Sequence, residues 1–237
     1  MSAVIRAILA ASWAGALLSP EELYHKVIVE YFRATLDGID VGDDDNPMLT
    51  VMTDFQAKAY FYAKGILRRF GGVLLADVVG LGKTFIGLAL LRHLQQSGQH
   101  GVVVAPPAVC ETWRALASEY RIELQVVSHG KLEDLDRYID REVLVVDESH
   151  TFRNINTRRY EMLHRWMNPD GVPSNRKVIL ISATPQNNRP RDILHQLRLF
   201  PVSYSRLPYR GESLEDYFRR VEGGREPLTN LLQHIVV

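Results

Sequence analysis

Five short runs rich in Val, Ile and Leu are spaced along the middle of the chain, and the stretches between them show helical periodicity. These runs are Val73–Ala76, Gly101–Ala105, Leu124–Val127, Glu142–Val146 and Lys177–Ile181. Apolar strands that alternate with helices are typical of a parallel sheet covered on both faces. The pattern therefore predicts an α/β fold in three layers, with a mostly parallel sheet and helices on each side.

Helical patterns flank this α/β region. One begins at Thr53 and continues through Arg69, and another contains Trp113 and Leu116. After Phe200 the strand pattern stops, and two further helices are expected over Ser213–Val221 and Pro227–Ile235. We expect residues 46–205 to form the main domain and residues 206–237 to form a helical segment that follows it.

The first 45 residues are expected to form an N-terminal helical extension. The apolar stretch Ala3–Leu18 suggests a signal peptide, but it is shorter than a membrane span and Arg6 interrupts it. Its three- and four-residue spacing favours a packed amphipathic helix, and a second helix follows over Ser19–Leu36. We expect no membrane contact, and we expect the acidic run Asp43–Asp45 to lie in a solvated linker.

Composition narrows the possible classes of function. The 237 residues contain 28 Lys and Arg and 28 Asp and Glu, so no overall field attracts nucleic acid or a membrane. Local basic faces remain open at Arg68–Arg69, Arg158–Arg159 and Arg219–Arg220, although solvated helix surface is the favoured interpretation of each pair. A single cysteine, Cys110, excludes an internal disulfide and a cysteine zinc cluster, which fits a reducing, cytoplasmic setting.

The junction after the first apolar run carries the strongest chemical signal. The turn Val79–Gly82 is followed by Lys83 and Thr84 and then by helical spacing of apolar residues. Glycine lets backbone N–H groups face a phosphate, Lys83 can reach the β and γ phosphates, and the Thr84 hydroxyl can bind Mg²⁺. Asp77 stands where the general G-x-x-x-x-G-K-S/T pattern has its first glycine, so a glycine-bearing turn without a ligand stays an alternative on this stretch alone.

The other apolar runs also end in polar residues, which should meet because ligands collect at the carboxyl ends of parallel strands. Asp147 and Glu148 end one run: an acid there can hold Mg²⁺, and its neighbour can deprotonate an attacking water. The stretch Ser182–Asn188 ends another run. Gln56 can read an adenine edge, but a surface glutamine at a helix start is favoured on chemistry alone.

Taken together, these motifs resemble the superfamily 2 helicases, in particular their Swi/Snf-type translocase branch. Asp77–Thr84 is similar to motif I, in which that branch carries Asp at the first position. Asp147–His150 resembles a DEAH-type motif II, and Ser182–Asn188 resembles motif III. Weaker similarities connect Phe55–Gln56 with the adenine-reading motif, Val104–Pro107 and Trp113 with motif Ia, and Ser128–Gly130 with the motif Ib region. The resemblance covers residues 50–200 and implies a RecA-like P-loop NTPase domain.

The resemblance also implies a role for each matching residue. Glu148, Asp147 and Lys83 are the expected catalytic residues, with Mg²⁺ held by Thr84 and Asp147. The expected ATP contacts are Gln56, Asp77, Gly80, Leu81, Gly82, Lys83 and Thr84. His150, Ser182 and Thr184 are expected to couple the nucleotide to a nucleic-acid track, and Pro106, Pro107 and Ser128 to lie near its phosphodiester backbone. One departure is Val78, where the branch often has Glu.

Three functions follow as hypotheses. The first is the ATP-binding half of a motor that moves on duplex DNA, whose second RecA-like domain would lie beyond Val237 and supply arginine fingers. The second is a P-loop NTPase or kinase that acts on a small molecule, against which the Ser182–Asn188 stretch argues. The third is a non-catalytic interaction module, against which the intact Lys83, Asp147 and Glu148 argue.

Overall fold

A computed structural model describes most of the α/β region and parts of the C-terminal segment. The described residues are 44–76, 82–169, 174–182, 190–201, 213–228, 231–232 and 235–237. The predicted N-terminal extension therefore lies outside the described residues, except for its last two positions.

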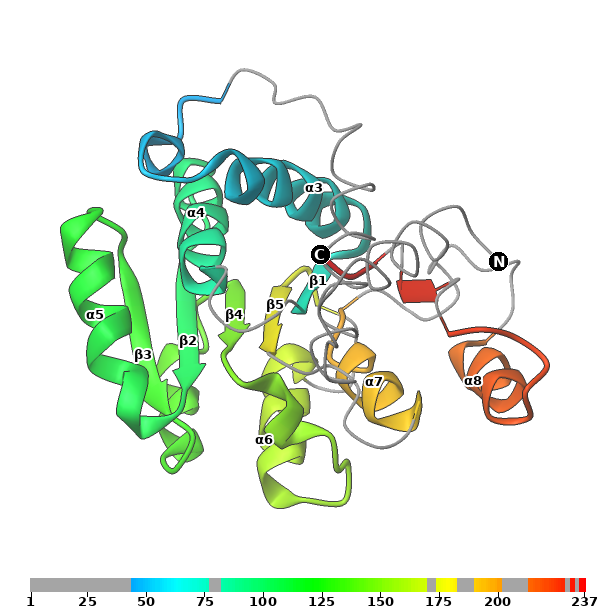
Figure 1. Cartoon of the computed structure of the whole chain (residues 1–237). Coiled ribbons are helices and arrows are strands. Elements are labelled where there is room, and N and C mark those ends of the chain that lie inside the picture. The colour runs from blue at the N-terminus through cyan, green and yellow to red at the C-terminus, as the bar shows by residue number, and fades with distance from the viewer. Residues whose placement is uncertain are drawn as a thin grey trace, which may run out of the picture.

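The centre of the fold is a five-stranded parallel sheet with the strand order β1-β5-β4-β2-β3 (Figure 1). The strands are β1 Gly72–Ala76, β2 Gly101–Ala105, β3 Leu124–Ser128, β4 Val143–Val146 and β5 Lys177–Ser182. All paired strands are parallel, and four of the five are buried along nearly their whole length. The predicted parallel sheet is confirmed, with each strand within one residue of its expected bounds.

Helices cover both faces of the sheet (Figure 1). One layer consists of α3 Asp54–Phe70, α4 Lys83–Gln96 and α5 Cys110–Glu119. The opposite layer contains α6 Arg158–Met167 and α7 Pro190–Leu197, together with the 3₁₀ turns η3 Leu132–Tyr138 and η4 Ser149–Phe152. Two further 3₁₀ turns, η1 Pro47–Thr50 and η2 Pro107–Val109, precede α3 and α5, and α8 Leu214–Glu222 packs on α7.

Local sequence signals set where the helices begin and end. Thr53 caps α3 through a reciprocal capping box with Gln56, and Gly71 ends the helix in the left-handed conformation at φ 68°. Thr157 and Ser213 cap α6 and α8 in the same way, each accepting a hydrogen bond from the third residue of its helix. These caps explain why the predicted helix starts agree with the structure.

A close contact between α4 and the sheet depends on Gly87. A β-carbon added at this position would lie 3.1 Å from Ile181 of β5 and 3.3 Å from the indole of Trp113. The helix therefore packs closely on the strands and on α5, and a larger residue here would require its neighbours to shift by a few tenths of an ångström.

Two features of the structure differ from the sequence-based expectations. Asp44 was expected in a solvated linker, but its side chain is only 4% exposed and accepts hydrogen bonds of 2.7 Å from Lys64 and Tyr60. Burial raises the pKa of Asp44, but hydrogen bonds from Lys64, Tyr60 and the Asn46 N–H outweigh it and hold the pKa below its ordinary value.

The second difference lies at the outer edge of β1. Val236 forms a parallel bridge with Leu74, and the Ala76 N–H donates to the Val237 carbonyl at 2.8 Å. The strand pattern was expected to stop after Phe200, yet these residues extend the sheet. The predicted helix over residues 227–235 falls partly outside the described residues.

Candidate functional site

Three neighbouring strands bring the predicted chemistry to one edge of the sheet. In the parallel register Ala76 of β1 lies beside Ser182 of β5, and Val146 of β4 lies beside Leu180. The residue after β4 is Asp147, so it lies about two strand spacings, roughly 10 Å, from the end of β1. Because β5 runs between them, Ser182 lies between the two predicted halves of the site.

The start of α4 supplies the phosphate-binding half. Gly82 precedes this helix in the left-handed conformation at φ 79°, and Lys83 and Thr84 form its first turn. No side chain caps this N-terminus among the described residues, so its N–H groups and the positive end of the helix dipole face outward. Asp77, Gly80 and Leu81 lie outside the described residues, so their predicted contacts stay predictions.

Gln56 lies directly against this turn. A β-carbon added to Gly82 would come within 2.2 Å of Gln56 Nε2, so the amide packs on the glycine backbone. The other end of the amide is engaged in the capping box, where Gln56 Oε1 accepts from the Thr53 N–H at 3.0 Å. The residue is thus a link between the start of α3 and the phosphate-binding turn, rather than a free surface side chain.

Asp147 is oriented by two hydrogen bonds. Its Oδ2 accepts from the indole Nε1 of Trp113 at 2.9 Å, and its Oδ1 accepts from the Glu148 N–H at 2.9 Å. Trp113 is 1% exposed and packs against α4 at Gly87. A rigid indole therefore sets the direction of the carboxylate, and each carboxylate oxygen keeps a lone pair for another partner.

Glu148 has an unusual backbone. Its φ of 51° and ψ of 49° are left-handed, a conformation that costs a non-glycine residue about 1 kcal/mol or more. Its Oε2 lies 3.1 Å from His150 Nδ1, a contact that becomes an ion pair when the histidine is protonated. The contact lacks hydrogen-bond geometry, and within the described part of the chain this buried oxygen has no hydrogen-bond donor.

His150 also reaches the neighbouring strand. The same Nδ1 lies 3.3 Å from the hydroxyl of Ser182 at the end of β5. Two predicted coupling residues, one after β4 and one at the end of β5, are therefore in contact. The third, Thr184, lies outside the described residues.

A buried histidine joins this group; it belongs to the Ser128–Gly130 match but was given no role of its own. His129 follows β3, is 7% exposed, and its Nε2 lies 2.9 Å from the Asp147 carbonyl. Burial lowers the pKa of His129, and the nearby Arg159 and His150 lower it further, against the opposing effect of the Asp147 carbonyl. Arg159 in turn donates to the His129 carbonyl at 3.0 Å, which fixes the loop after β3.

This loop borders an open hollow of about 740 Å³ beside the site. Its lining includes Pro107, Gly130, Thr151, Arg158 and Arg159. Pro107 therefore shares this hollow with two arginines and with Glu133, and its predicted position near a phosphate backbone stays a prediction. Pro106 and Ser128 are not among the residues that line the hollow: the Pro106 carbonyl accepts from Cys110 Sγ, and the Ser128 hydroxyl accepts from the Gly130 N–H.

One buried contact had no signal in the sequence. Ser149 donates to Gln196 Oε1 of α7 at 2.7 Å, and both residues are fully buried. The pair anchors the turn that carries Glu148 and His150 to the opposite helical layer. Residues 47 positions apart show no local pattern, so only the fold reveals this contact.

The described residues fit a magnesium ion that is shared with a phosphate ligand. Mg²⁺ in such sites uses one or two protein oxygens together with substrate phosphates and water. Asp147 offers a carboxylate with free lone pairs, and Thr84 offers a hydroxyl in the first turn of α4. A metal site built from protein side chains alone is not found, because the described residues contain no group of three His, Cys, Asp or Glu side chains that could hold an ion.

Of the helices that the structure describes, none is long and apolar enough to span a membrane.

Together the parallel sheet, the two helical layers and the position of this site at the carboxyl edge define a RecA-like α/β domain. The fold is similar to that of the Sulfolobus solfataricus SWI2/SNF2 ATPase core, solved in complex with dsDNA. The TM-score is 0.60 and the sequence identity 16%, over 84% of this chain and 46% of that one. At this identity the likeness establishes the fold alone.

Comparison of sequences also finds curated relatives among the SWI/SNF-related proteins. The chain is 25% identical over 186 residues to the SWI/SNF-related matrix-associated actin-dependent regulator of chromatin subfamily A-like protein 1 of Xenopus laevis. It is also 25% identical over 185 residues to the DNA annealing helicase and endonuclease ZRANB3 of Mus musculus. These matches cover 69% and 65% of this chain but 18% and 16% of the relatives, so the chain spans less than a fifth of their length.

No family model matches the chain. The relatives nevertheless confirm the resemblance to Swi/Snf-type helicases that the motifs predicted. The individual residue roles stay predictions, although the structure brings Asp147, Glu148, His150 and Ser182 together at the carboxyl ends of β4 and β5.

Proposed function

We propose that this chain is the ATP-binding half of an ATP-dependent motor that moves on duplex DNA. The observation that supports this best is the contact between His150 and Ser182, which links the acidic pair after β4 to the strand beside the start of α4. A site for nucleotide hydrolysis alone has no need of such a link. A motor needs one, because the state of the nucleotide must reach the nucleic-acid surface.

In this proposal the start of α4 holds the phosphates of ATP. The N–H groups of its first turn and the Lys83 ammonium neutralise phosphate charge, and Thr84 and Asp147 hold Mg²⁺. Bound Mg²⁺ would supply charge neutralisation at the transferred phosphate. Gln56 would contact the adenine, and the position of its amide against the phosphate-binding turn supports this.

Glu148 accepts the proton of the attacking water. Its carboxylate lies at the end of a strained backbone turn, and the neighbouring His150 is the nearest group that can respond to a change in its charge. When Glu148 gains a proton, its attraction to a protonated His150 is lost, and the His150–Ser182 contact is free to rearrange. Ser182 and Thr184 then pass this change toward the nucleic-acid surface.

The nucleic-acid surface is the hollow beside His129. Arg158, Arg159 and the Pro107 turn lie on it, so contacts would go to phosphates rather than to bases. Duplex DNA is the proposed track, since the structurally similar SWI2/SNF2 core was solved with dsDNA and the related ZRANB3 is described as a DNA annealing helicase.

The domain division is part of the same proposal. Residues 46–205 form the first RecA-like unit, residues 1–45 a helical extension, and residues 206–237 lead toward a second RecA-like domain that completes the site. Arginine fingers from that domain contribute roughly 10³–10⁵ in rate in related phosphoryl transfer. The chain alone should therefore bind ATP·Mg weakly and turn it over very slowly. The proposed place of action is the interior of the cell.

Binding of a fluorescent ATP analogue to this chain tests the nucleotide site. Lys83→Ala should weaken binding about 10- to 100-fold, the expected loss for a charge-assisted contact with phosphate. Lys58→Ala on α3 is a matched control that should leave affinity unchanged. Equal effects of the two substitutions would contradict the placement of the phosphates at α4.

Turnover is tested by DNA-stimulated ATP hydrolysis, measured with the proposed second RecA-like domain present. Glu148→Gln should keep ATP binding and abolish DNA-stimulated hydrolysis, and persistent hydrolysis would remove Glu148 from its role. Arg158→Ala should reduce stimulation by DNA and lower the salt dependence of DNA binding by about one phosphate contact. Arg219→Ala, which removes an arginine paired with Asp216 on α8, is the control. A rate of ATP hydrolysis that does not change when DNA is added would favour the small-molecule kinase instead.

A further inference from the structure

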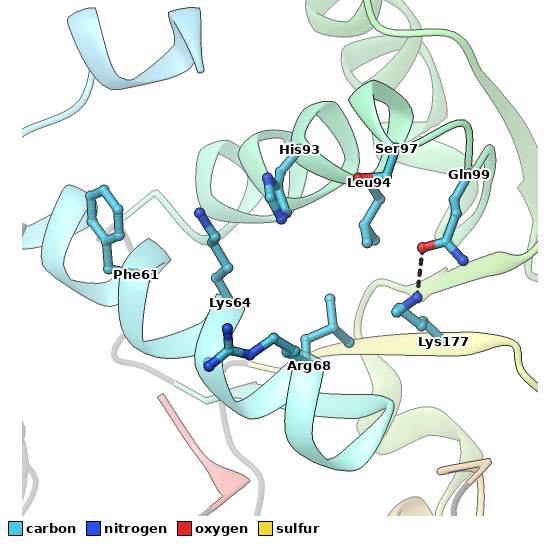
Figure 2. Close-up of a pocket in the computed structure, with 10 residues that line it drawn as sticks. Phe61, Lys64, Arg68, His93, Leu94, Ser97, Gln99 and Lys177 are labelled. Atoms are coloured by element: carbon cyan, nitrogen blue, oxygen red, sulfur yellow. Dashed lines mark hydrogen bonds between the residues drawn. The ribbon is translucent and has the colours of Figure 1, made fainter. Parts of the chain in front are cut away.

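A second hollow lies near the amino-terminal end of β5, whereas the candidate ATP site lies at the carboxyl ends of the strands. It has a volume of about 450 Å³ and is enclosed by α3, by the end of α4 and by the first residue of β5 (Figure 2). Because β5 has six residues, this hollow lies roughly 15–20 Å from the carboxyl edge that carries Asp147. It is therefore separate from the nucleotide site and independent of the proposed motor function.

The polar lining of this hollow is mainly cationic. Lys64 and Arg68 come from α3, and Lys177 begins β5 (Figure 2). Lys64 is paired with Asp44 at 2.7 Å, and Lys177 donates to Gln99 Oε1 at 2.6 Å. Arg68, by contrast, has no hydrogen bond or ion pair with any described residue. The lining thus holds three cations, and only Lys64 forms an ion pair with a neighbouring acid.

Gly65 leaves open space on the α3 side of the hollow. Gly65 lies inside α3, where glycine costs about 1 kcal/mol relative to alanine, and it lines the hollow. A β-carbon added there would meet no atom within 4 Å, so nothing in the described protein requires a glycine. A helix-weakening residue without a packing role fits a wall that a ligand approaches closely.

We propose that this hollow binds a small organic phosphate. Lys64, Arg68 and Lys177 neutralise the phosphate group, and Ser97 and the free N–H groups of the Gln99 amide donate to its oxygens. The apolar part of the ligand packs on Leu67, Leu94 and Phe61, which also line the hollow. A neighbouring hollow shares Lys64, His93 and Ser97 but is bordered by Asp44 and Asp45, so repulsion from these acids favours a phosphate on the side of Arg68 and Lys177.

His93 provides an internal reporter of an anion. Burial lowers the pKa of this histidine and so do the charges of Lys64 and Lys177, whereas Asp44 and Asp45 raise it. Its ring also meets the edge of Tyr60 at 6.5 Å between centroids. An anion bound between Lys64 and Arg68 should offset the two lysines, so the pKa of His93 should rise when the site fills.

Phenyl phosphate is a suitable probe, followed by ¹⁵N NMR in the Lys83→Ala background, which weakens phosphate binding at the candidate nucleotide site. We expect saturable shifts at the amides of Gly65, Ser97 and Gln99, together with a rise in the His93 pKa. Inorganic phosphate should produce the same shifts with lower affinity, and phenol should produce none. Absence of saturation at millimolar phenyl phosphate, or shifts confined to other parts of the chain, would overturn the proposal.

Two pairs of variants separate binding from folding. Arg68→Ala should weaken phenyl phosphate about tenfold. Arg69→Ala removes the adjacent arginine, which stacks on Phe70 outside the hollow, and should leave affinity unchanged. Gly65→Leu should raise the melting temperature, because leucine favours a helix, and should abolish binding by filling the space. Gly65→Ala, with less added volume, should stabilise equally and weaken binding less. Equal effects of the two arginine variants, or unchanged binding in Gly65→Leu, would exclude the site.

Discussion

Trp113 should control how strongly magnesium supports nucleotide binding. Its indole donates a hydrogen bond of 2.9 Å to Asp147 Oδ2, and the side chain is almost fully buried. Trp113→Phe keeps a large aromatic ring but removes this donor, so the carboxylate loses the contact that sets its direction.

The size of the effect follows from the type of contact. A hydrogen bond to a charged group contributes about 1.5–3 kcal/mol, and loss of a partner that orients a metal ligand commonly weakens metal binding 10- to 100-fold. Because Asp147 is partly exposed, the lower end applies. We expect the Mg²⁺ concentration that half-saturates ATP binding to rise about tenfold in Trp113→Phe.

The assay is a magnesium titration of the binding of a fluorescent ATP analogue to the chain. Trp166 offers a matched control, since it is 2% exposed and its Nε1 has no hydrogen-bond partner within the described residues. Trp166→Phe removes the same atoms from the core without losing a hydrogen bond. If the two variants show the same magnesium midpoint, the indole does not orient Asp147 and the reasoning fails.

Three further substitutions test other contacts. Gly82→Ala places a side chain at φ 79° and against Gln56 Nε2, so the free energy of unfolding should fall by about 1–2 kcal/mol and ATP affinity should fall with it; unchanged urea unfolding and affinity would contradict the contact. Asp44 has a lowered pKa in the folded protein, so its stabilising effect is complete above about pH 4, the unfolded value, and is lost as the pH falls through the folded value. Asp44→Asn should therefore flatten the acid side of a plot of urea midpoint against pH, and an unchanged slope would refute the assignment. Ser149→Ala removes the donor to the buried Gln196 Oε1 and should lower the free energy of unfolding by about 1–3 kcal/mol, which chemical denaturation measures; no loss would show that the pair does not anchor the turn.

The strands and helix starts were predictable because their signals are local. Glycine or proline bounds several of the apolar runs, and β2 agrees with its expected range at both ends. Thr53 and Ser213 mark the starts of their helices, because each side chain accepts a hydrogen bond from a backbone N–H three residues later. The convergence of Asp147, His150 and Ser182 was also predictable, since parallel strands bring their carboxyl ends to one edge.

Contacts between distant residues were not predictable in this way. The acidic run was expected to be solvated because charge runs usually are, yet α3 places Lys64 and Tyr60 where they bury Asp44. Trp113 and Asp147 are 34 positions apart, and His129 reaches the Asp147 backbone only because β3, β2 and β4 lie side by side. Each of these contacts depends on the strand order, which apolar periodicity does not specify.

The tight seat of α4 on the sheet has a mechanical consequence. A β-carbon at Gly87 would lie within 3.3 Å of both Ile181 and the indole of Trp113, so the helix that begins at Lys83 packs closely on the ring that holds Asp147. The two sides of the candidate pocket are thus connected through one side chain, Trp113. A methyl group introduced at Gly87, one helical turn after Lys83, would press on this ring and should change the orientation of Asp147 without removing any proposed ligand contact.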